Sequence, residues 1–280
     1  MKCYLFVLCP PFSGSTVLWR LLATSPHVSA LPDEGQFLES VEPLMRRRKG
    51  KGDRPRDWVL IKQKWEQVWD LSKHVLVEKS PPNLVRAFEI QKHFSPCRFV
   101  SMIRNPYAFC EGNHRRRGLG MEYAAGRWLF YAAHQRKNIE GLEHVLHFTY
   151  EQFTEDSKSI CERILEFLPE LERIDSEGTF KARSIHGRGD RPIENLNTLK
   201  INQLSAREIS RINRVLDEQA PLLEYFGYDL IDPTADRCPY QFRSNASVRA
   251  TRTVQWLKRL PLRVALGAKL YRRRFFHRTS

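Results

Sequence analysis

Short apolar runs recur along the chain, and each is followed by small, polar or proline residues and then by a segment with helical periodicity. Residues 4–8 form the first run, and residues 74–78, 98–103 and 145–148 form three more. Runs of this length and composition are typical of strands that are buried on both faces of a parallel sheet. After the first run, apolar residues at positions 17, 18, 21 and 22 share one helical face.

The segments between these runs predict helices, so strands and helices alternate along the chain. We expect helices over residues 61–71, 84–94, 121–142 and 205–223, another that begins at Pro106, and one that follows Tyr150 and runs through Leu168. Proline suits the first turn of a helix. The alternation predicts an α/β fold in which helices flank a central parallel sheet on both faces. Ligands then collect at the carboxyl ends of the strands.

Two further segments are less regular. Residues 28–31 predict a second short strand, and residues 32–45 predict a helix whose first turn contains Asp33 and Glu34. Residues 178–200 are rich in glycine and basic side chains and only weakly periodic, which predicts a long loop or lid.

Composition and charge divide the chain in two. Its 280 residues carry a net charge of +14, but residues 237–280 contain 12 Lys and Arg and no Asp or Glu. The rest therefore has 46 − 12 = 34 basic against 32 acidic residues, a net charge of +2. We expect an α/β domain over residues 1–236 and a basic tail over residues 237–280. Because the basic charge belongs to the tail, the net charge gives no support for nucleic-acid binding by the domain.

The tail also has amphipathic character. Val254, Leu257 and Leu260 share one helical face, and aromatic residues lie further along. A basic amphipathic segment can lie on an anionic membrane surface, and it can equally dock on the domain. Contact with RNA or DNA is a third interpretation, and all three stay open.

Six cysteines show neither a Cys-x-x-Cys pair nor the spacing of metal ligands. Cys3 and Cys9 flank a predicted buried strand, where free thiols are common. This usage favours a reducing compartment. Since no segment approaches the roughly 18 apolar residues that span a membrane, we expect a cytoplasmic protein.

The loop between the first strand and the first helix is a candidate anion site. It contains Ser13, Gly14, Ser15 and Thr16, and the following helix begins there. Loop amides and the N-terminus of a helix together favour a phosphate group. The loop lacks the lysine of a Walker A motif, so ordinary nucleotide triphosphate hydrolysis fits poorly. The same residues can also serve as a simple helix cap.

This loop resembles the 5′-phosphosulfate loop of sulfotransferases that use 3′-phosphoadenosine 5′-phosphosulfate (PAPS). Phe12 stands where that family usually has a basic residue. Lys79, in a Lys-Ser-Pro segment that follows a buried strand, matches the lysine that contacts the bridging oxygen in tyrosylprotein-type and related members. The resemblance implies a P-loop NTPase-like sheet of the sulfotransferase type and is nearest to the tyrosylprotein and carbohydrate branch.

A second phosphate motif follows the strand over residues 98–103. Arg104 stands at the strand tip before Asn-Pro, and arginine presents a planar fork of donors to a phosphate. The resemblance makes Arg104 the 3′-phosphate ligand. Gly112 stands where the family usually has a serine, with Asn113 and His114 as substitutes, and Arg116 matches a further arginine of the tyrosylprotein branch.

Two later residues complete the expected nucleotide site. Tyr150 follows the strand over residues 145–148, and its ring can lie near an adenine while its hydroxyl stays in water. The family often closes over the nucleotide with a late basic loop, which here implies Arg188. Packing alone can also explain Tyr150.

The acceptor hydroxyl needs a base. The resemblance assigns this role to Glu34, if one inserted residue is allowed, although Asp33 and Glu34 can also merely cap a helix. His114 and His186 are alternative bases.

The resemblance implies a sulfotransferase that moves the sulfuryl group from PAPS to a hydroxyl acceptor and releases adenosine 3′,5′-bisphosphate. The scheme requires no metal. A sugar, lipid, phenol or tyrosine can be the acceptor, and an anionic membrane is a possible partner of the tail. Two alternatives remain: a P-loop-like small-molecule kinase, and an inactive nucleotide-binding protein at the membrane periphery.

Overall fold

Five parallel strands form the centre of the computed structural model, which describes residues 2–45, 56–184 and 186–234. The strands are β1 (Cys3–Leu8), β2 (Val28–Ala30), β3 (Val75–Glu78), β4 (Cys97–Ile103) and β5 (Val145–Thr149), in the spatial order β2-β3-β1-β4-β5. All four neighbouring strand pairs are parallel, so every strand ends at the same edge of the sheet. The expected parallel α/β fold is confirmed.

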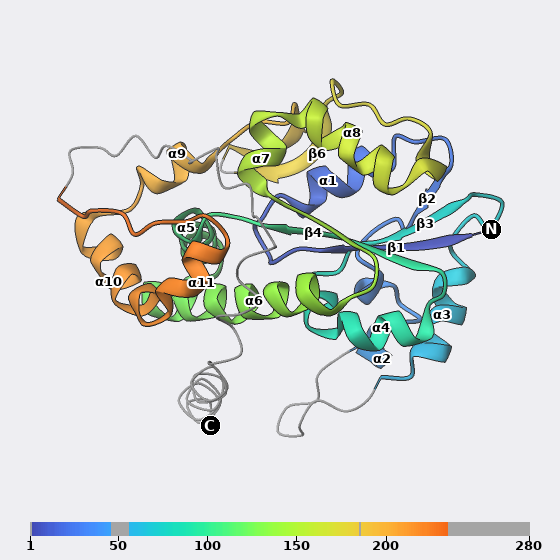
Figure 1. Cartoon of the computed structure of the whole chain (residues 1–280), viewed down its shortest axis with the longest axis horizontal. Coiled ribbons are helices and arrows are strands. Elements are labelled where there is room, and N and C mark those ends of the chain that lie inside the picture. Colours follow the sequence, from blue (N-terminus) through green and yellow to red (C-terminus); the bar gives the residue numbers. More distant parts are fainter. Residues whose placement is uncertain (1, 46–55, 185, 235–280) are drawn as a thin grey trace.

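Helices cover both faces of this sheet (Figure 1). One face carries α1 (Ser15–Leu22), α7 (Tyr150–Glu155) and α8 (Ser157–Phe167). The opposite face carries α2 (Glu42–Met45), α3 (Trp58–Glu66), α4 (Ala87–His93) and α6 (Met121–Gly141). The apolar runs of the strands are buried between these two layers.

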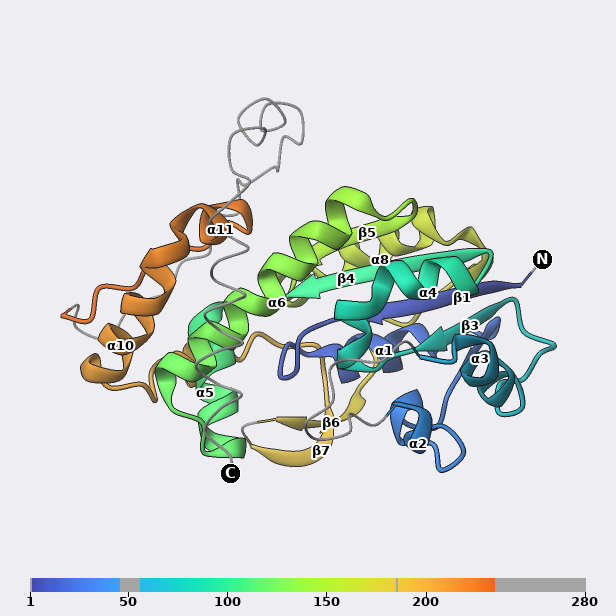
Figure 2. The same cartoon turned by 90° about the horizontal axis from the view of Figure 1, so that it is seen from below.

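Helices α5 (Pro106–Arg117), α9 (Asn197–Ile201), α10 (Ala206–Leu216) and α11 (Ala220–Tyr225) lie beyond the carboxyl ends of the strands, as Figure 2 shows for α5, α10 and α11. The antiparallel hairpin of β6 (Phe180–Ser184) and β7 (Gly187–Arg191) packs against α1 through β6. A capping box between Ser205 and Glu208 starts α10, as its sequence predicts.

Several predicted elements are wrong in detail. The helix predicted to follow Tyr150 and run through Leu168 is two helices, of which α7 already begins at Tyr150, because Asp156 leaves the helical conformation and its side chain caps α8. The helix over 205–223 is likewise divided into α10 and α11. Residues 178–200 are not one long loop, since they contain the β6–β7 hairpin and begin α9.

The predicted helix over residues 32–45 is also wrong. The chain forms only a 3₁₀ turn over Gly35–Phe37 and the short α2. The cause is tertiary: Gly35 packs against the Trp65 indole, whose Nε1 donates to the Gly35 carbonyl at 3.2 Å. A Cβ at this glycine would lie 2.6 Å from Trp65 Nε1 and 2.9 Å from Glu78 Oε1.

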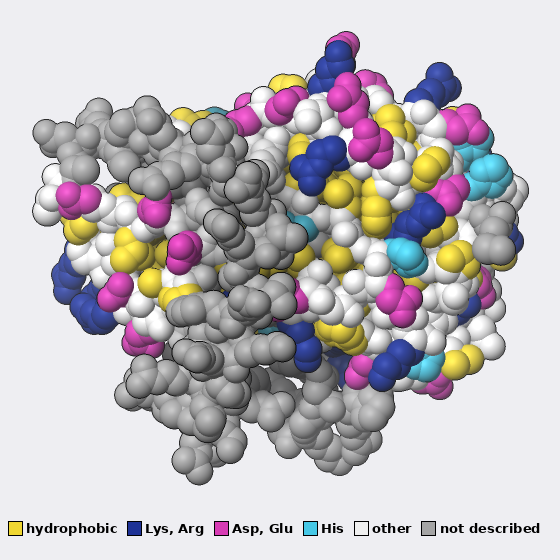
Figure 3. Space-filling model, in the orientation of Figure 1, with side chains coloured by type: hydrophobic (Ala, Val, Ile, Leu, Met, Phe, Trp, Pro, Cys, Tyr) yellow, Lys and Arg dark blue, Asp and Glu magenta, His cyan; other side chains and the backbone are white. Residues whose placement is uncertain are grey.

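The surface of the described residues agrees with the nearly neutral charge of the domain. On the face in Figure 3, basic and acidic side chains are interspersed. None of the described helices is long and apolar enough to cross a membrane. The basic tail over residues 237–280, with its predicted membrane contact, lies outside the described residues, and its separation from the domain stays a prediction.

The contact at Gly35 gives a stability prediction. We expect Gly35→Ala to lower the free energy of unfolding by about 1–3 kcal/mol, because the added methyl has no room beside Trp65. Urea denaturation measures this change. Gly189→Ala is the control, since a Cβ there meets nothing within 4 Å, and it should change the free energy by less than about 0.5 kcal/mol. Equal effects of the two substitutions would contradict the packing argument.

Candidate active site

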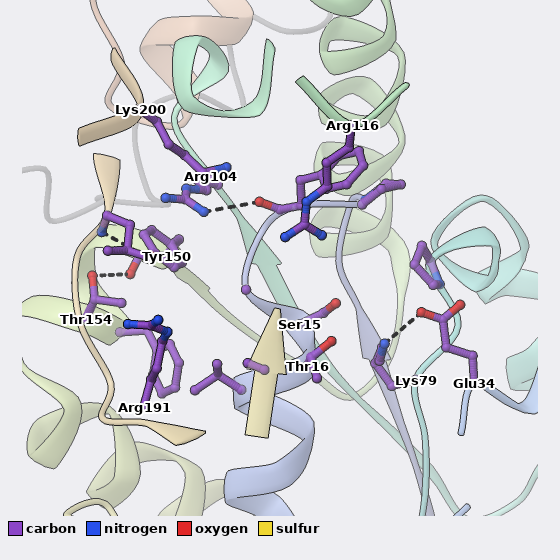
Figure 4. A pocket seen from close by; sticks show the side chains of 18 of the residues that line it. Ser15, Thr16, Glu34, Lys79, Arg104, Arg116, Tyr150, Thr154, Arg191 and Lys200 are labelled. Atoms are coloured by element: carbon purple, nitrogen blue, oxygen red, sulfur yellow. Dashed lines mark hydrogen bonds and ion pairs between the residues drawn. The ribbon is translucent and has the colours of Figure 1, made fainter. Parts of the chain in front are cut away.

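One cavity of about 470 Å³ opens at the carboxyl edge of the sheet, a volume in the usual range for small-molecule sites. The predicted site residues that line it are Gly14, Ser15, Thr16, Glu34, Lys79, Arg104, Arg116 and Tyr150. They come from the ends of different strands and meet because those strands are parallel. In Figure 4, Ser15 and Thr16 lie between Arg104 on one side and Lys79 with Glu34 on the other.

The loop between β1 and α1 lines the cavity. Phe12 and Gly14 have left-handed φ values of 64° and 84°, which turn the chain sharply into α1. Gly14 packs against Tyr150, whose Cδ2 would lie 2.8 Å from an added Cβ. The Ser13 side chain is fully buried behind the loop, and its Oγ has no hydrogen-bond partner among the described residues. Ser15 begins α1, so the first helical amides face the cavity region.

Arg104 is buried and held in one orientation from three directions. Its Nε donates to Asn197 Oδ1 at 2.7 Å, and its Nη1 donates to the Phe12 carbonyl at 3.2 Å. Its guanidinium lies 3.8 Å from the centroid of the Tyr150 ring. The third nitrogen, Nη2, is buried without a partner among the described residues. A buried guanidinium that lines a cavity with an unused donor is suited to bind an anion.

A buried carboxylate, Glu151, organises this half of the site. Its Oε1 accepts from the Asn105 backbone amide at 3.0 Å and from the Asn197 side-chain amide, and its Oε2 accepts from the Tyr228 hydroxyl at 2.7 Å. Asn105 adjoins Arg104, and Asn197 binds the guanidinium directly. Glu151 therefore fixes both neighbours of Arg104.

The Tyr150 hydroxyl differs from the expectation that it stays in water. It donates to the Glu194 carbonyl at 2.8 Å and accepts from the Leu196 amide at 3.2 Å. The ring is 4% exposed. Tyr150 thus ties the segment after the β6–β7 hairpin to the end of β5, while one ring face supports Arg104.

Glu34 and Lys79 meet at the other end of the cavity. Lys79 Nζ lies 2.7 Å from Glu34 Oε1, and the Gln36 side chain donates to Glu34 Oε2 at 2.5 Å. Both charged side chains are mostly buried. The Glu34 side chain does not cap a helix, since the turn after it shows no side-chain cap. Glu34, the predicted base, and Lys79, the predicted contact of the bridging oxygen, therefore lie together at the cavity wall.

A second buried carboxylate, Glu78, positions this pair. It accepts from the Gly35 amide at 2.9 Å and the Ser80 amide at 3.1 Å, and from the side chains of Ser80 and Asn83. Gly35 follows Glu34, and Ser80 follows Lys79. Burial raises the pKa of Glu78 to about 7, against the opposing effect of the Ser80 hydrogen bond. Glu78 thereby links the two chain segments that carry the charged pair.

Lys200 is a cavity residue that the sequence reasoning missed. It is 4% exposed, and its Nζ lies 3.4 Å from Glu111 Oε2 and 3.3 Å from the Ala108 carbonyl. Burial lowers the pKa of Lys200 to about 7, and the charge of Arg104 lowers it further, against Glu111. No local motif marks this lysine, because its position depends on the packing of α9 against α5.

Lys200 lies beside the two positions that depart from the family motif. A Cβ at Gly112 would lie 2.9 Å from Lys200 Nζ and 3.2 Å from Phe12 Cβ. The space that the expected serine would need is therefore occupied by the Phe12 side chain and the lysine ammonium.

The remaining predicted residues divide between the cavity and the surface. Arg116 lines the cavity and lies 5.4 Å from the Phe12 ring centroid. Arg188 is exposed on β7 and does not line the cavity, whereas Arg191 on the same strand does. The alternative bases His114 and His186 are exposed and do not line it either. Within the described residues, no group of three or more His, Cys, Asp or Glu side chains is placed to hold a metal ion.

A parallel sheet with a small-residue loop between its first strand and first helix defines a P-loop-like α/β protein. The sequence pattern of the sulfotransferase family matches residues 5–174, more than half of the chain. The chain therefore belongs to the sulfotransferase family, as its motifs predict, while its branch within that family stays a prediction. No curated protein sequence matches the chain.

Solved sulfotransferase structures are similar to the chain. A sulfotransferase from Alicyclobacillus acidocaldarius shares 18% identity, with a TM-score of 0.47, over 78% of this chain and 96% of that one. The sulfotransferase domain from the curacin biosynthetic pathway shares 16% identity, with a TM-score of 0.49, over 82% and 99%. A mouse sulfotransferase complexed with PAP shares 13% identity, with a TM-score of 0.49, over 80% and 90%.

The hydrogen bonds of Glu78 give a second stability prediction. All its partners are donors, so the amide of Glu78→Gln would place an N–H group against another donor. We expect this substitution to lower the free energy of unfolding at pH 8 by about 1–3 kcal/mol, as measured by urea denaturation. Glu162→Gln, on the exposed face of α8, should change it by less than about 0.5 kcal/mol. A neutral effect of Glu78→Gln would refute the positioning role.

Proposed function

We propose that the protein transfers the sulfuryl group of PAPS to a hydroxyl acceptor and releases adenosine 3′,5′-bisphosphate. One observation carries this proposal: Ser15 of the β1–α1 loop and Arg104 at the tip of β4 line the same cavity. A ligand with two separated anionic groups can therefore reach both. Five basic side chains on the cavity wall favour a polyanionic donor: Lys79, Arg104, Arg116, Arg191 and Lys200.

In this proposal each end of the cavity holds one anionic group of the donor. The loop containing Ser13, Gly14, Ser15 and Thr16 binds the 5′-phosphosulfate together with Lys79. At the other end, Arg104 and Lys200 bind the 3′-phosphate, and Arg104 uses its unpaired Nη2 for that contact. Tyr150 and Arg191 border the space for the nucleoside, and Arg116 reaches toward the loop (Figure 4).

The proposed reaction is an in-line transfer. The acceptor oxygen attacks sulfur, the bond between sulfur and the bridging oxygen breaks, and that oxygen leaves on the 5′-phosphate. Glu34 accepts the proton of the acceptor hydroxyl. Lys79 stabilises the negative charge that develops on the leaving oxygen. Their 2.7 Å contact keeps base and cation at the same end of the cavity, where the acceptor enters.

We also propose a cytoplasmic location. Cys3, Cys9, Cys97, Cys110 and Cys161 are buried, unpaired thiols, a state that a reducing compartment favours.

Nucleotide titration tests the proposed function. We expect adenosine 3′,5′-bisphosphate to bind at least about tenfold more tightly than ATP with Mg²⁺, measured by isothermal titration calorimetry. Arg104→Ala should weaken bisphosphate binding on the order of 100-fold, because it removes a buried charged donor. Preferential binding of ATP with Mg²⁺ would instead support a kinase, and unchanged bisphosphate affinity in Arg104→Ala would refute the site.

Two further variants control this experiment. Arg104→Lys keeps the positive charge but lacks the planar guanidinium, so it should bind the bisphosphate with intermediate affinity. Such a result would show that Arg104→Ala loses a contact with the ligand and not the fold. Glu34→Gln should keep bisphosphate affinity and lose transfer of radiolabelled sulfate from PAPS to a mixed acceptor pool. Bisphosphate binding by the wild-type protein without transfer to any acceptor would support the inactive alternative.

Lys200 gives a prediction on pH. Its ammonium loses its proton above pH 7 in the free protein, and a bound phosphate favours the charged form. Bisphosphate binding at pH 8 should therefore take up close to one proton, and affinity should fall as the pH rises above 7. Calorimetry in buffers of different ionisation enthalpy measures this uptake.

The matched variant for this test is Lys200→Arg. Arginine stays charged at pH 8, so bisphosphate should still bind while the proton uptake disappears. Proton uptake that persists in Lys200→Arg would assign the effect to another group and contradict the role of Lys200.

A further inference from the structure

The cavity has a third group of cations that the donor does not use. In the proposed function, one anionic end of PAPS occupies the loop with Lys79, and the other occupies Arg104 with Lys200. Arg117 and Arg127 also line the cavity. Neither forms an ion pair with an Asp or Glu among the described residues. Two arginines on the wall of an active-site cavity without a carboxylate partner provide donors for another anion.

The chain brings these two arginines together by a sharp turn between helices. Arg117 is the last residue of α5, and Gly118 after it has a left-handed φ of 65°. The chain then returns in α6, which packs against α5. Arg127 lies two turns into α6, where its Nη2 donates to the Tyr131 hydroxyl at 3.0 Å. The Arg117 guanidinium lies 4.9 Å from the Phe12 ring centroid.

The pKa of Arg117 reflects both the second arginine and the proposed base. Burial lowers the pKa of Arg117, and the charge of Arg127 lowers it further, whereas the Glu34 carboxylate acts in the opposite direction. The pKa of Arg117 therefore depends both on the positive charge of Arg127 and on the negative charge of the proposed base. An anion between the two guanidinium groups would relieve their repulsion.

An apolar surface borders the same end of the cavity. Phe37 belongs to the turn that directly follows Glu34, lines the cavity and is 59% exposed. Pro81 and Pro82, next to Lys79, line it as well. An exposed phenyl ring beside prolines favours a flat apolar group of a ligand.

We propose that Arg117 and Arg127 form an acceptor subsite, and that the natural acceptor is acidic: it carries a carboxylate, sulfate or phosphate group near the hydroxyl that receives the sulfuryl group. The acceptor also presents an apolar surface to Phe37. This inference rests on the proposed function and narrows it to one substrate class. It uses residues that the nucleotide leaves free.

A matched pair of phenols tests the proposal. The probes are 4-hydroxyphenylacetate and 4-hydroxyphenylacetamide, which differ in one negative charge, and each is titrated calorimetrically into protein saturated with adenosine 3′,5′-bisphosphate. We expect the acid to bind at least about tenfold more tightly than the amide. In the double variant Arg117→Gln/Arg127→Gln this preference should fall to less than about twofold, while bisphosphate affinity changes less than about threefold.

Arg207→Gln, on the exposed face of α10, removes a positive charge away from the cavity and should keep the full preference for the acid. This control separates a local subsite from the general charge of the protein. Equal binding of the two phenols, undetectable binding of the acid, or an unchanged preference in the double variant would overturn the inference. Failure of the wild-type protein to bind the bisphosphate would refute the proposed function itself, and the acceptor subsite with it.

Discussion

The parallel pairing of five buried strands is the constraint on which the rest of the structure depends. Parallel strands end at one edge, and each connection must leave that edge and return to the other. The loop after β1, the lysine after β3, the arginine after β4 and the tyrosine after β5 therefore meet around one cavity. The apolar side chains of the strands take no part in binding or catalysis, but the pairing of the strands determines where the polar residues after them lie.

Two buried glutamates fix the relative positions of the chain segments that meet at this edge. Glu78 links the segments that carry Glu34 and Lys79. Glu151 links Asn105 to Asn197, which holds Arg104. A buried carboxylate is costly unless donors surround it. Each glutamate therefore enforces its local arrangement, because any displacement would leave charge or donors unsatisfied.

The departures of this chain from the family motif form one coupled change. Phe12, Gly112 and Lys200 come from the first loop, α5 and α9, and Gly112 lies against both the Phe12 side chain and the Lys200 ammonium. Phe12 and Lys200 also line the cavity. Considered singly, the phenylalanine and the glycine suggest a weakened anion site. Considered with Lys200, they leave room for a lysine on a helix that packs against α5, and burial lowers the pKa of that lysine to about 7.

The sequence by itself determined the parallel sheet, the small-residue loop, Lys79, Arg104 and the family, because apolar runs and residues adjacent to them are local patterns. Tertiary structure alone decided the rest. Gly35 lies under Trp65 and so cannot begin the predicted helix, and the weakly periodic segment before α9 pairs with itself as a hairpin. Lys200, Arg117 and Arg127 line the cavity because of helix packing, which brings together residues that no local sequence pattern connects.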